Sequence, residues 1–161
     1  PQMFLDEKID RLKKEFSPMD FKVPFTTGSN ILKSIEAEFI SIKDVSKELN
    51  NLGQHFNNWA DNIKHKIEIK SVELDTHNTW LNKLDSNTNY WIVVANGNSP
   101  SFKHLVYDCK PNALIALISI TQSDFFVVDK KYKWFSYFQV NRQKNQATIF
   151  KSGEKMTPFE M

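Results

Sequence analysis

The sequence predicts an α+β fold, with a mainly antiparallel sheet of about five or six strands, helices packed on it and a helical N-terminal half. Two observations predict it. Short bursts of β-branched and aromatic residues, separated by turn residues, fill positions 90–150. Before position 86, apolar residues recur mostly at helical spacing. The chain has 161 residues, 40% of them hydrophobic, so we expect a single domain, 1–161, with a substantial core.

The N-terminal part, 1–86, is expected to be mostly helical with one strand. Helices are predicted where apolar residues return every three or four positions among charged ones. Ser29 or Asn30 is suited to cap the second helix, and Gly53 to end the third. A strand is predicted where apolar and polar residues alternate strictly. The predicted elements are helices over 3–16, 31–39, 44–52 and 76–84, a short extended piece over 21–25, and the strand over 67–74.

The second part, 87–150, predicts the order strand, strand, helix, strand, strand, strand. One burst is long enough for a helix, and Pro111 stands where the first helical turn tolerates proline. Leu114, Leu117 and Ile118 share one face of that helix, so we expect it to lie flat on the sheet. The bursts are 90–95, 104–107, 113–120 (within a helix over 111–122), 125–128, 134–140 and 147–150.

Composition excludes several classes of protein. The four glycines stand far apart, so the glycine-rich phosphate loop and the dinucleotide fingerprint are absent, and no cofactor is expected. Cys109 is the single cysteine, so no internal disulfide is possible, which fits a reducing compartment. The first sixteen residues alternate charged and apolar groups, unlike a signal peptide. The longest apolar run, 114–120, is far shorter than the roughly 18 residues of a membrane span, so we expect no membrane association.

Histidine and cysteine offer little for catalysis. His55, His65, His77 and His104 show no paired spacing, so no metal site is expected. His104 and Asp108 would share a strand face but lie about 13 Å apart along it, too far for direct contact. Cys109 precedes the 111–122 helix, where a thiol can have a lowered pKa and act as a nucleophile. A lone cysteine is more often a small buried hydrophobe, so catalysis by Cys109 or His104 ranks last.

Lysines alternate with aromatic residues after position 129. Proteins that bind single-stranded nucleic acid combine rings that stack on bases with cations that meet phosphates. The other interpretation is a solvated turn followed by a strand whose rings belong to the core. The net charge of only +2 and the presence of just two arginines favour the second interpretation. The candidate binding residues are Lys130, Lys131, Tyr132, Lys133, Arg142 and Lys144.

Three segments together carry a resemblance to a known group of proteins: 90–96, 105–108 and 124–134. They resemble small bacterial α+β domains in which a YxxVDKKYxW-like strand follows a helix laid on a sheet, some of them similar to Smi1/Knr4-type immunity proteins of bacterial toxin systems. The histidine pair associated with the strand after the tryptophan is missing, and residues 139–142 read Gln-Val-Asn-Arg instead. The resemblance implies an α+β fold, a cytoplasmic bacterial protein and binding without catalysis.

The leading functional hypothesis is a non-enzymatic protein-interaction module of a bacterium, of the immunity type, whose partner is a toxin or another protein. The alternative is nucleic-acid or polyanion binding through residues 130–144. A third hypothesis is a small hydrolase that uses Cys109 or His104.

Overall fold

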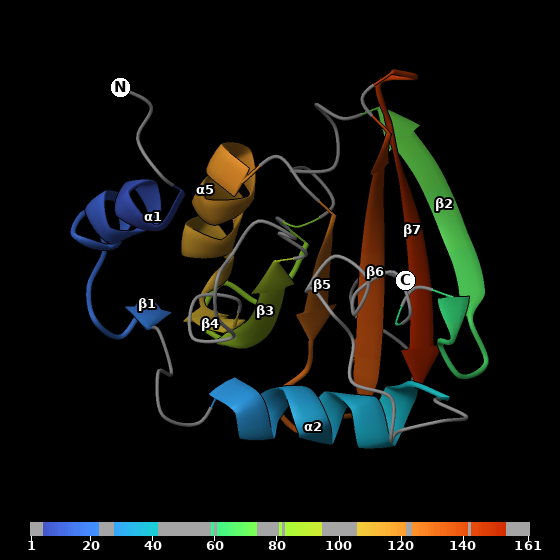
Figure 1. Ribbon diagram of the computed structural model, residues 1–161. Coiled ribbons are helices and arrows are strands. Elements are labelled where there is room, and N and C mark those ends of the chain that lie inside the picture. Colours follow the sequence, from blue (N-terminus) through green and yellow to red (C-terminus); the bar gives the residue numbers. More distant parts are fainter. Residues whose placement is uncertain are drawn as a thin grey trace.

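The computed structural model describes residues 5–22, 28–41, 59, 61–73, 81, 83–94, 106–121, 124–141 and 143–153. These residues form one seven-stranded sheet with the order β1-β4-β3-β5-β6-β7-β2, in which all neighbouring strands are antiparallel (Figure 1). The strands are β1 (Phe21–Lys22), β2 (Ile67–Glu73), β3 (Tyr90–Val94), β4 (Val106–Cys109), β5 (Phe125–Val128), β6 (Trp134–Asn141) and β7 (Gln146–Gly153). The helices are α1 (Leu5–Lys13), α2 (Gly28–Phe39) and α5 (Pro111–Thr121).

The α+β class is confirmed, and two finer expectations are wrong. The sheet has seven strands instead of five or six, because the short extended piece predicted over 21–25 pairs with β4 as the edge strand β1. The helices of the described residues are not mainly N-terminal, since α5 comes from the second half, and the N-terminal half also supplies both edge strands, β1 and β2. A strand of two residues is too short to show a period in the sequence, which is why β1 was not counted among the predicted strands.

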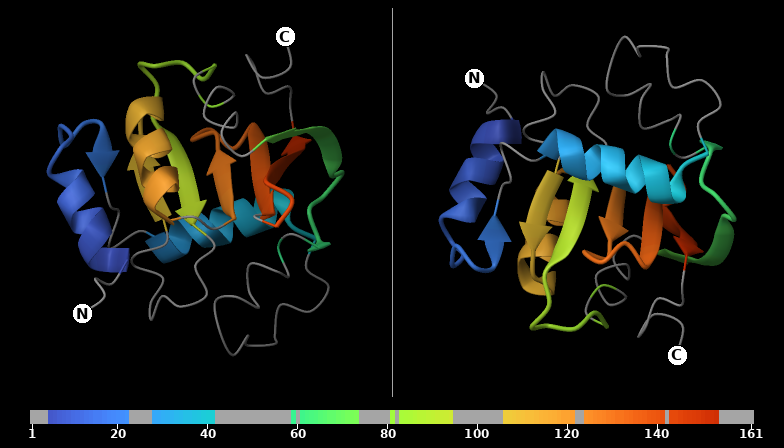
Figure 2. Two further views of the ribbon diagram at one scale, coloured as in Figure 1. Left: turned by 90° about the horizontal axis from the view of Figure 1, so that it is seen from above. Right: turned by 90° about the horizontal axis from the view of Figure 1, so that it is seen from below.

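Helices cover both faces of the sheet, as the views from above and below show (Figure 2). α5 connects β4 to β5, which both pair with β3 and therefore run parallel to each other. Parallel strands need such a crossover connection, and α5 provides it across one face. α1 packs beside α5, whereas α2 crosses the opposite face near the end where β5 and β7 finish. We call these the α5 face and the α2 face.

Alternate residues of the central strands supply the two cores. In β5, Phe125 and Val127 lie in the α5-face cluster, while Phe126 and Val128 lie in the α2-face cluster. All four side chains are fully buried. A strand covered on both faces reads as a continuous apolar run, so the bursts of the sequence mark strands that are buried on both sides.

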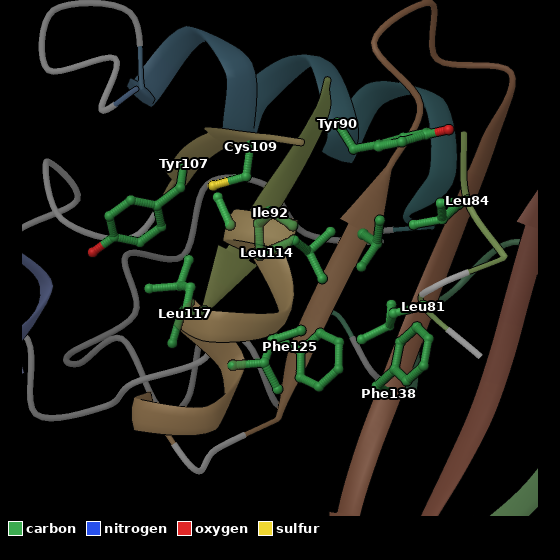
Figure 3. Close-up of a cluster of buried hydrophobic side chains, with 14 of the residues drawn as sticks. Leu81, Leu84, Tyr90, Ile92, Tyr107, Cys109, Leu114, Leu117, Phe125 and Phe138 are labelled. Atoms are coloured by element: carbon green, nitrogen blue, oxygen red, sulfur yellow. The ribbon is translucent and has the colours of Figure 1, made fainter. Parts of the chain in front are cut away.

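The α5-face core is built from helix α5 and the strands below it, as seen in Figure 3. Leu114 and Leu117 are fully buried and Ile118 nearly so, which confirms that α5 lies flat on the sheet. Ser136 is a buried polar residue on this face, and its hydroxyl donates a hydrogen bond to the carbonyl of Val127 at 2.9 Å. The buried hydroxyl is thus satisfied, as buried polar groups generally are.

The α2-face core is a set of packed rings. The ring of Trp59 lies edge-on to Phe126 at 5.3 Å between centroids, and Phe126 lies at 5.3 Å from Phe135. Phe39, the last residue of α2, stacks on Phe135 at 5.4 Å. The indole Nε1 of Trp59 donates to Glu36 Oε1 at 2.7 Å, which holds the Trp59 side chain on α2. Such ring pairs each add about 0.5–1.5 kcal/mol beyond burial.

Strand β2 corrects the expectation of strict alternation. Its pairing with β7 shifts register between Glu68 and Lys70, so that Ile69 is an extra residue opposite β7. This bulge explains why the apolar residues of the strand change from odd to even positions between Ile69 and Val72. Both side chains are half-buried against the α5-face cluster. The bulge therefore brings residues of both parities to one face.

Several element boundaries differ from those expected, among them β4 at Val106–Cys109 instead of 104–107 and β7 at Gln146–Gly153 instead of 147–150. Helix α1 ends at Lys13, three residues before the expected end at Phe16. Helix α2 begins at Gly28, so Ser29 and Asn30 lie in its first turn instead of capping it. The predicted helix over 44–52 with Gly53, and most of the predicted helix over 76–84, lie outside the described residues. Among the helices of the described chain, none is long and apolar enough to cross a membrane.

Candidate functional site

The predicted lysine segment forms the turn between β5 and β6, and this turn is fixed by its own backbone. The amide of Tyr132 donates to the carbonyl of Asp129 at 2.9 Å, and the amide of Asp129 donates to the carbonyl of Trp134 at 3.2 Å. The amide of Lys133 donates to Asp129 Oδ2 at 3.2 Å. Tyr132 has φ 56°, the left-handed region that few residues other than glycine adopt. An aspartate that accepts from the following amides is typical of a tight turn.

Lys130 folds back from this turn across β3 to reach β4. Its Nζ lies 2.6 Å from Asp108 Oδ2, and 4.5 Å from the centroid of the Trp91 ring. The Asp108 side chain is only 9% exposed, so the ion pair is partly shielded from solvent. A charge-assisted hydrogen bond and a cation–π contact together hold this ammonium group. The ammonium group of Lys130 therefore interacts with groups of the protein itself.

Asp108 is the centre of a polar cluster on the α2 face. Its neighbours in register are Trp91 on β3 and Lys22 on β1. Its second oxygen, Oδ1, accepts a hydrogen bond from Asn89 Nδ2 at 2.9 Å, and the same Nδ2 lies 3.0 Å from the Met19 carbonyl. A buried carboxylate requires partners of this kind to offset the loss of hydration. Asp108 thus joins the segment before β1, the start of β3 and the β5–β6 turn.

The rings of the segment belong mostly to the core. Trp134 is 6% exposed and lies 5.7 Å from Tyr90, and Phe135 is fully buried on the α2 face. Tyr132 is half-buried against the α2-face cluster. The interpretation of Trp134 and Phe135 as core rings is confirmed, so they offer no stacking surface for bases.

The structure does not bring all six predicted residues together. Lys144 lies in the turn between β6 and β7, exposed, with its amide donating to Asn141 Oδ1 at 3.1 Å. Strand β6 has 8 residues and separates this turn from Lys130–Lys133 by about 25 Å. Arg142 lies outside the described residues. The segment 130–144 therefore runs between opposite ends of the sheet and is not a single surface.

A second turn, 64–66, lies beside the first, and sequence reasoning missed it. The Ser152 hydroxyl donates to the carbonyl of Lys64, which places that turn against the end of β7. The next residue, Gly153, has φ 92°, and a Cβ on it would lie 2.5 Å from the carbonyl oxygen of Lys133. The end of β7 is thus in contact with both turns. We call the two turns, residues 64–66 and 130–133, the lysine end of the sheet.

The lysines of the 64–66 turn also make contacts of their own. Lys64 Nζ donates to the carbonyl of Ala37 at 3.1 Å, near the C-terminus of α2, where a cation is favoured by the helix dipole. Lys66 Nζ lies 5.0 Å from the Phe150 ring centroid. Between them, His65 is exposed with φ 50°. These residues are joined to Lys133 by contacts with β7 that link segments far apart in sequence, so no local signal predicts the cluster.

Cys109 is placed as a core residue. It is fully buried in the α5-face cluster (Figure 3). Burial raises the pKa of its thiol well above the usual value, and the neighbouring Asp108 carboxylate raises it further. The thiol therefore stays protonated and inaccessible, which opposes the nucleophile hypothesis. His104, His55 and His77 lie outside the described residues, and the described part of the chain holds no group of three metal-ligating side chains.

Comparison with known proteins adds no assignment. No protein-family model, no curated protein and no solved structure matches this chain. The resemblance to Smi1/Knr4-type proteins accordingly stays a prediction.

Proposed function

We propose that this chain is a non-enzymatic protein-interaction module that acts in the bacterial cytoplasm as an immunity-type protein, masking a toxin or another protein partner. One observation carries the proposal. Both faces of the sheet are covered by helices, and the aromatic side chains of β5 and β6 are buried in the two cores. Recognition is then left to the rim, and the shielded cysteine supplies no nucleophile.

Affinity capture from the source organism tests this proposal, with the whole chain as bait. We expect a protein that co-purifies through size-exclusion chromatography and loses its own activity when this chain is added. Where the neighbouring gene encodes a toxin, co-expression of this chain should restore growth. Absence of any protein partner, together with turnover of ester or peptide substrates that Cys109→Ser abolishes, would contradict the proposal.

A second candidate function is nucleic-acid or polyanion binding, favoured by the five lysines that the two turns bring to the lysine end. Each phosphate contact by a lysine releases counterions, so the affinity should fall steeply as salt rises. Binding should also be lost in Lys130→Ala/Lys131→Ala. Absent or salt-insensitive binding to single-stranded DNA and RNA removes this candidate.

A further inference from the structure

We infer that the lysine end is the docking site and that its partner is an acidic protein surface, contacted by Lys131 and Lys133. This inference rests on the proposed function, which it deepens by naming the surface and the chemistry of the partner. It divides the predicted lysines into two groups with different tasks. Lys130 and Lys64 are positioning residues, whose ammonium groups are bound within the protein, while Lys131 and Lys133 face solvent.

The first step of the argument is local charge. Lys131 and Lys133 are exposed, and no carboxylate among the described residues pairs with either. The acidic groups of the β5–β6 region are already engaged. Asp108 binds Lys130 and Asn89, and Asp129 Oδ2 accepts from the backbone of Lys133. The five lysines of this end exceed the two carboxylates, Asp108 and Asp129, by three positive charges (5 − 2), and this excess steers an acidic partner to it.

The second step is rigidity. Three hydrogen bonds fix the backbone of the β5–β6 turn, and the pair of Lys130 with Asp108 ties it to β4. The carbonyl of Lys133 packs directly against Gly153 at the end of β7. A surface that is already ordered loses little conformational freedom on binding, so more of its interaction energy appears as affinity. The turn is therefore preorganised to present Lys131 and Lys133.

The third step separates a protein from a nucleic acid. Trp134 and Phe135 are buried, so the stacking platforms that single-stranded nucleic acid requires are missing from this turn. The chain has only two arginines, and its net charge is +2. Tyr132, half-buried beside the two lysines, has the amphipathic ring that is enriched in protein interfaces. An acidic protein surface fits this combination better than a phosphate backbone.

The decisive experiment compares three baits in the same nuclease-treated lysate of the source organism. They are the wild-type chain, the charge reversal Lys131→Glu/Lys133→Glu, and the control Lys144→Glu, which adds negative charge at the opposite end of β6. All altered side chains are exposed, so we expect unchanged melting curves. Binding of the three proteins to a short fluorescent single-stranded DNA is measured in parallel.

We expect an acidic protein to be captured equally by wild type and Lys144→Glu and to be reduced roughly tenfold or more on the double reversal, because like charges then oppose each other. Equal capture by the double reversal would overturn the docking site and leave the proposed function standing. No captured protein on any bait overturns both. Saturable DNA binding that the double reversal abolishes would assign the lysine end to nucleic acid and overturn the acidic-protein inference.

The positioning role of Lys130 has its own readout. Lys130→Met should weaken capture while leaving the salt dependence of the association rate unchanged, because the exposed lysines that steer the partner remain. Lys130→Arg should restore capture, since a guanidinium group can also pair with Asp108. A reduced salt dependence in Lys130→Met would show instead that this ammonium group meets the partner directly.

Discussion

The α5 face and the α2 face of one sheet are closed in different ways. On the α5 face, helix α5 contributes aliphatic side chains, with Leu114 and Leu117 fully buried, and these pack on strands that carry rings such as the stacked pair Phe125 and Phe138. The α2 face is closed by rings and by three carboxylates that each bind a donor from another segment. These pairs are Asp108 with Lys130, Glu36 with Trp59, and Asp124 with Tyr137.

This difference between the two faces indicates where the positions of side chains and turns are most tightly fixed. Apolar packing is non-directional and tolerates small shifts, whereas hydrogen bonds to a carboxylate set the position of each donor to within a few tenths of an ångström. The directional contacts lie at the border of the α2 face, and one of them holds the β5–β6 turn. The docking turn proposed above lies at this border, where directional contacts hold its position.

The largest effect is expected for Phe126→Ala, which removes the centre of the ring cluster. Phe126 is fully buried and contacts Trp59, Phe135 and Tyr137 at 4.9–5.3 Å between centroids. We expect a loss of about 3–5 kcal/mol in the free energy of unfolding, measured by urea denaturation. The matched change on the other face, Leu117→Ala, should cost less because no ring pairs are lost. A larger loss for Leu117→Ala would break the comparison.

Gly153→Ala is expected to be the next most costly change. Its φ of 92° is strained for any side chain, and a Cβ there would meet the Lys133 carbonyl oxygen at 2.5 Å and the Phe39 ring at 3.1 Å. We expect a loss of about 2–3 kcal/mol. Asn145, with φ 53° in the β6–β7 turn, is the control. Asn145→Gly relieves the same kind of strain and should leave the melting temperature unchanged or slightly raised.

The strands of the second half were predictable because burial on both faces leaves a plain signal. All four side chains of β5 are buried, and five successive residues of β6 are buried from Trp134 onward. β1 gave almost no signal, since two residues cannot show a period. In β2, the apolar residues change from odd to even positions, which indicates a bulge. The sequence does not show which residue is the extra one, and the pairing with β7 does.

The site was predictable only in part, because its contacts join segments far apart in sequence. The alternation of lysines and rings pointed to the β5–β6 turn, which is exposed and ordered. The partner of Lys130 stands 22 positions earlier and is reached only because β3 lies between β4 and β5. The inclusion of Lys144 followed from closeness in sequence, but an extended strand carries residues apart as it lengthens.

Lys130→Met sharpens the comparison at the border of the α2 face. The change removes the cation from a mostly buried carboxylate and leaves Asp108 with the Asn89 amide. We expect a loss of about 1–2 kcal/mol in the free energy of unfolding, because a buried acceptor is then short of partners. Lys131→Met, one residue along and exposed, is the control and should change stability by less than about 0.5 kcal/mol. Equal losses in both variants would show that the Asp108 pair contributes nothing to stability.

Tyr137→Phe has the smallest expected effect at neutral pH and the clearest dependence on pH. The Tyr137 hydroxyl donates to Asp124 Oδ2 at 2.8 Å, so its removal should cost about 1 kcal/mol. Burial raises the pKa of Tyr137 far above its ordinary value of 10.0, and the Asp124 carboxylate raises it further. The folded protein therefore keeps the phenolic proton at a pH where the unfolded chain releases it.

The sign of the effect follows from that difference. The stability that the hydroxyl contributes is complete below pH ~10 and is lost as pH rises above it, by about 1.4 kcal/mol per pH unit. The variant lacks the group, so its disadvantage should shrink and then reverse as urea denaturation is repeated at increasing pH above 10. Tyr90 and Cys109, whose pKa values are also raised by burial, remain in both proteins and cancel in the difference. A stability difference that stays constant through this range would mean that the proton of Tyr137 is not held by the fold.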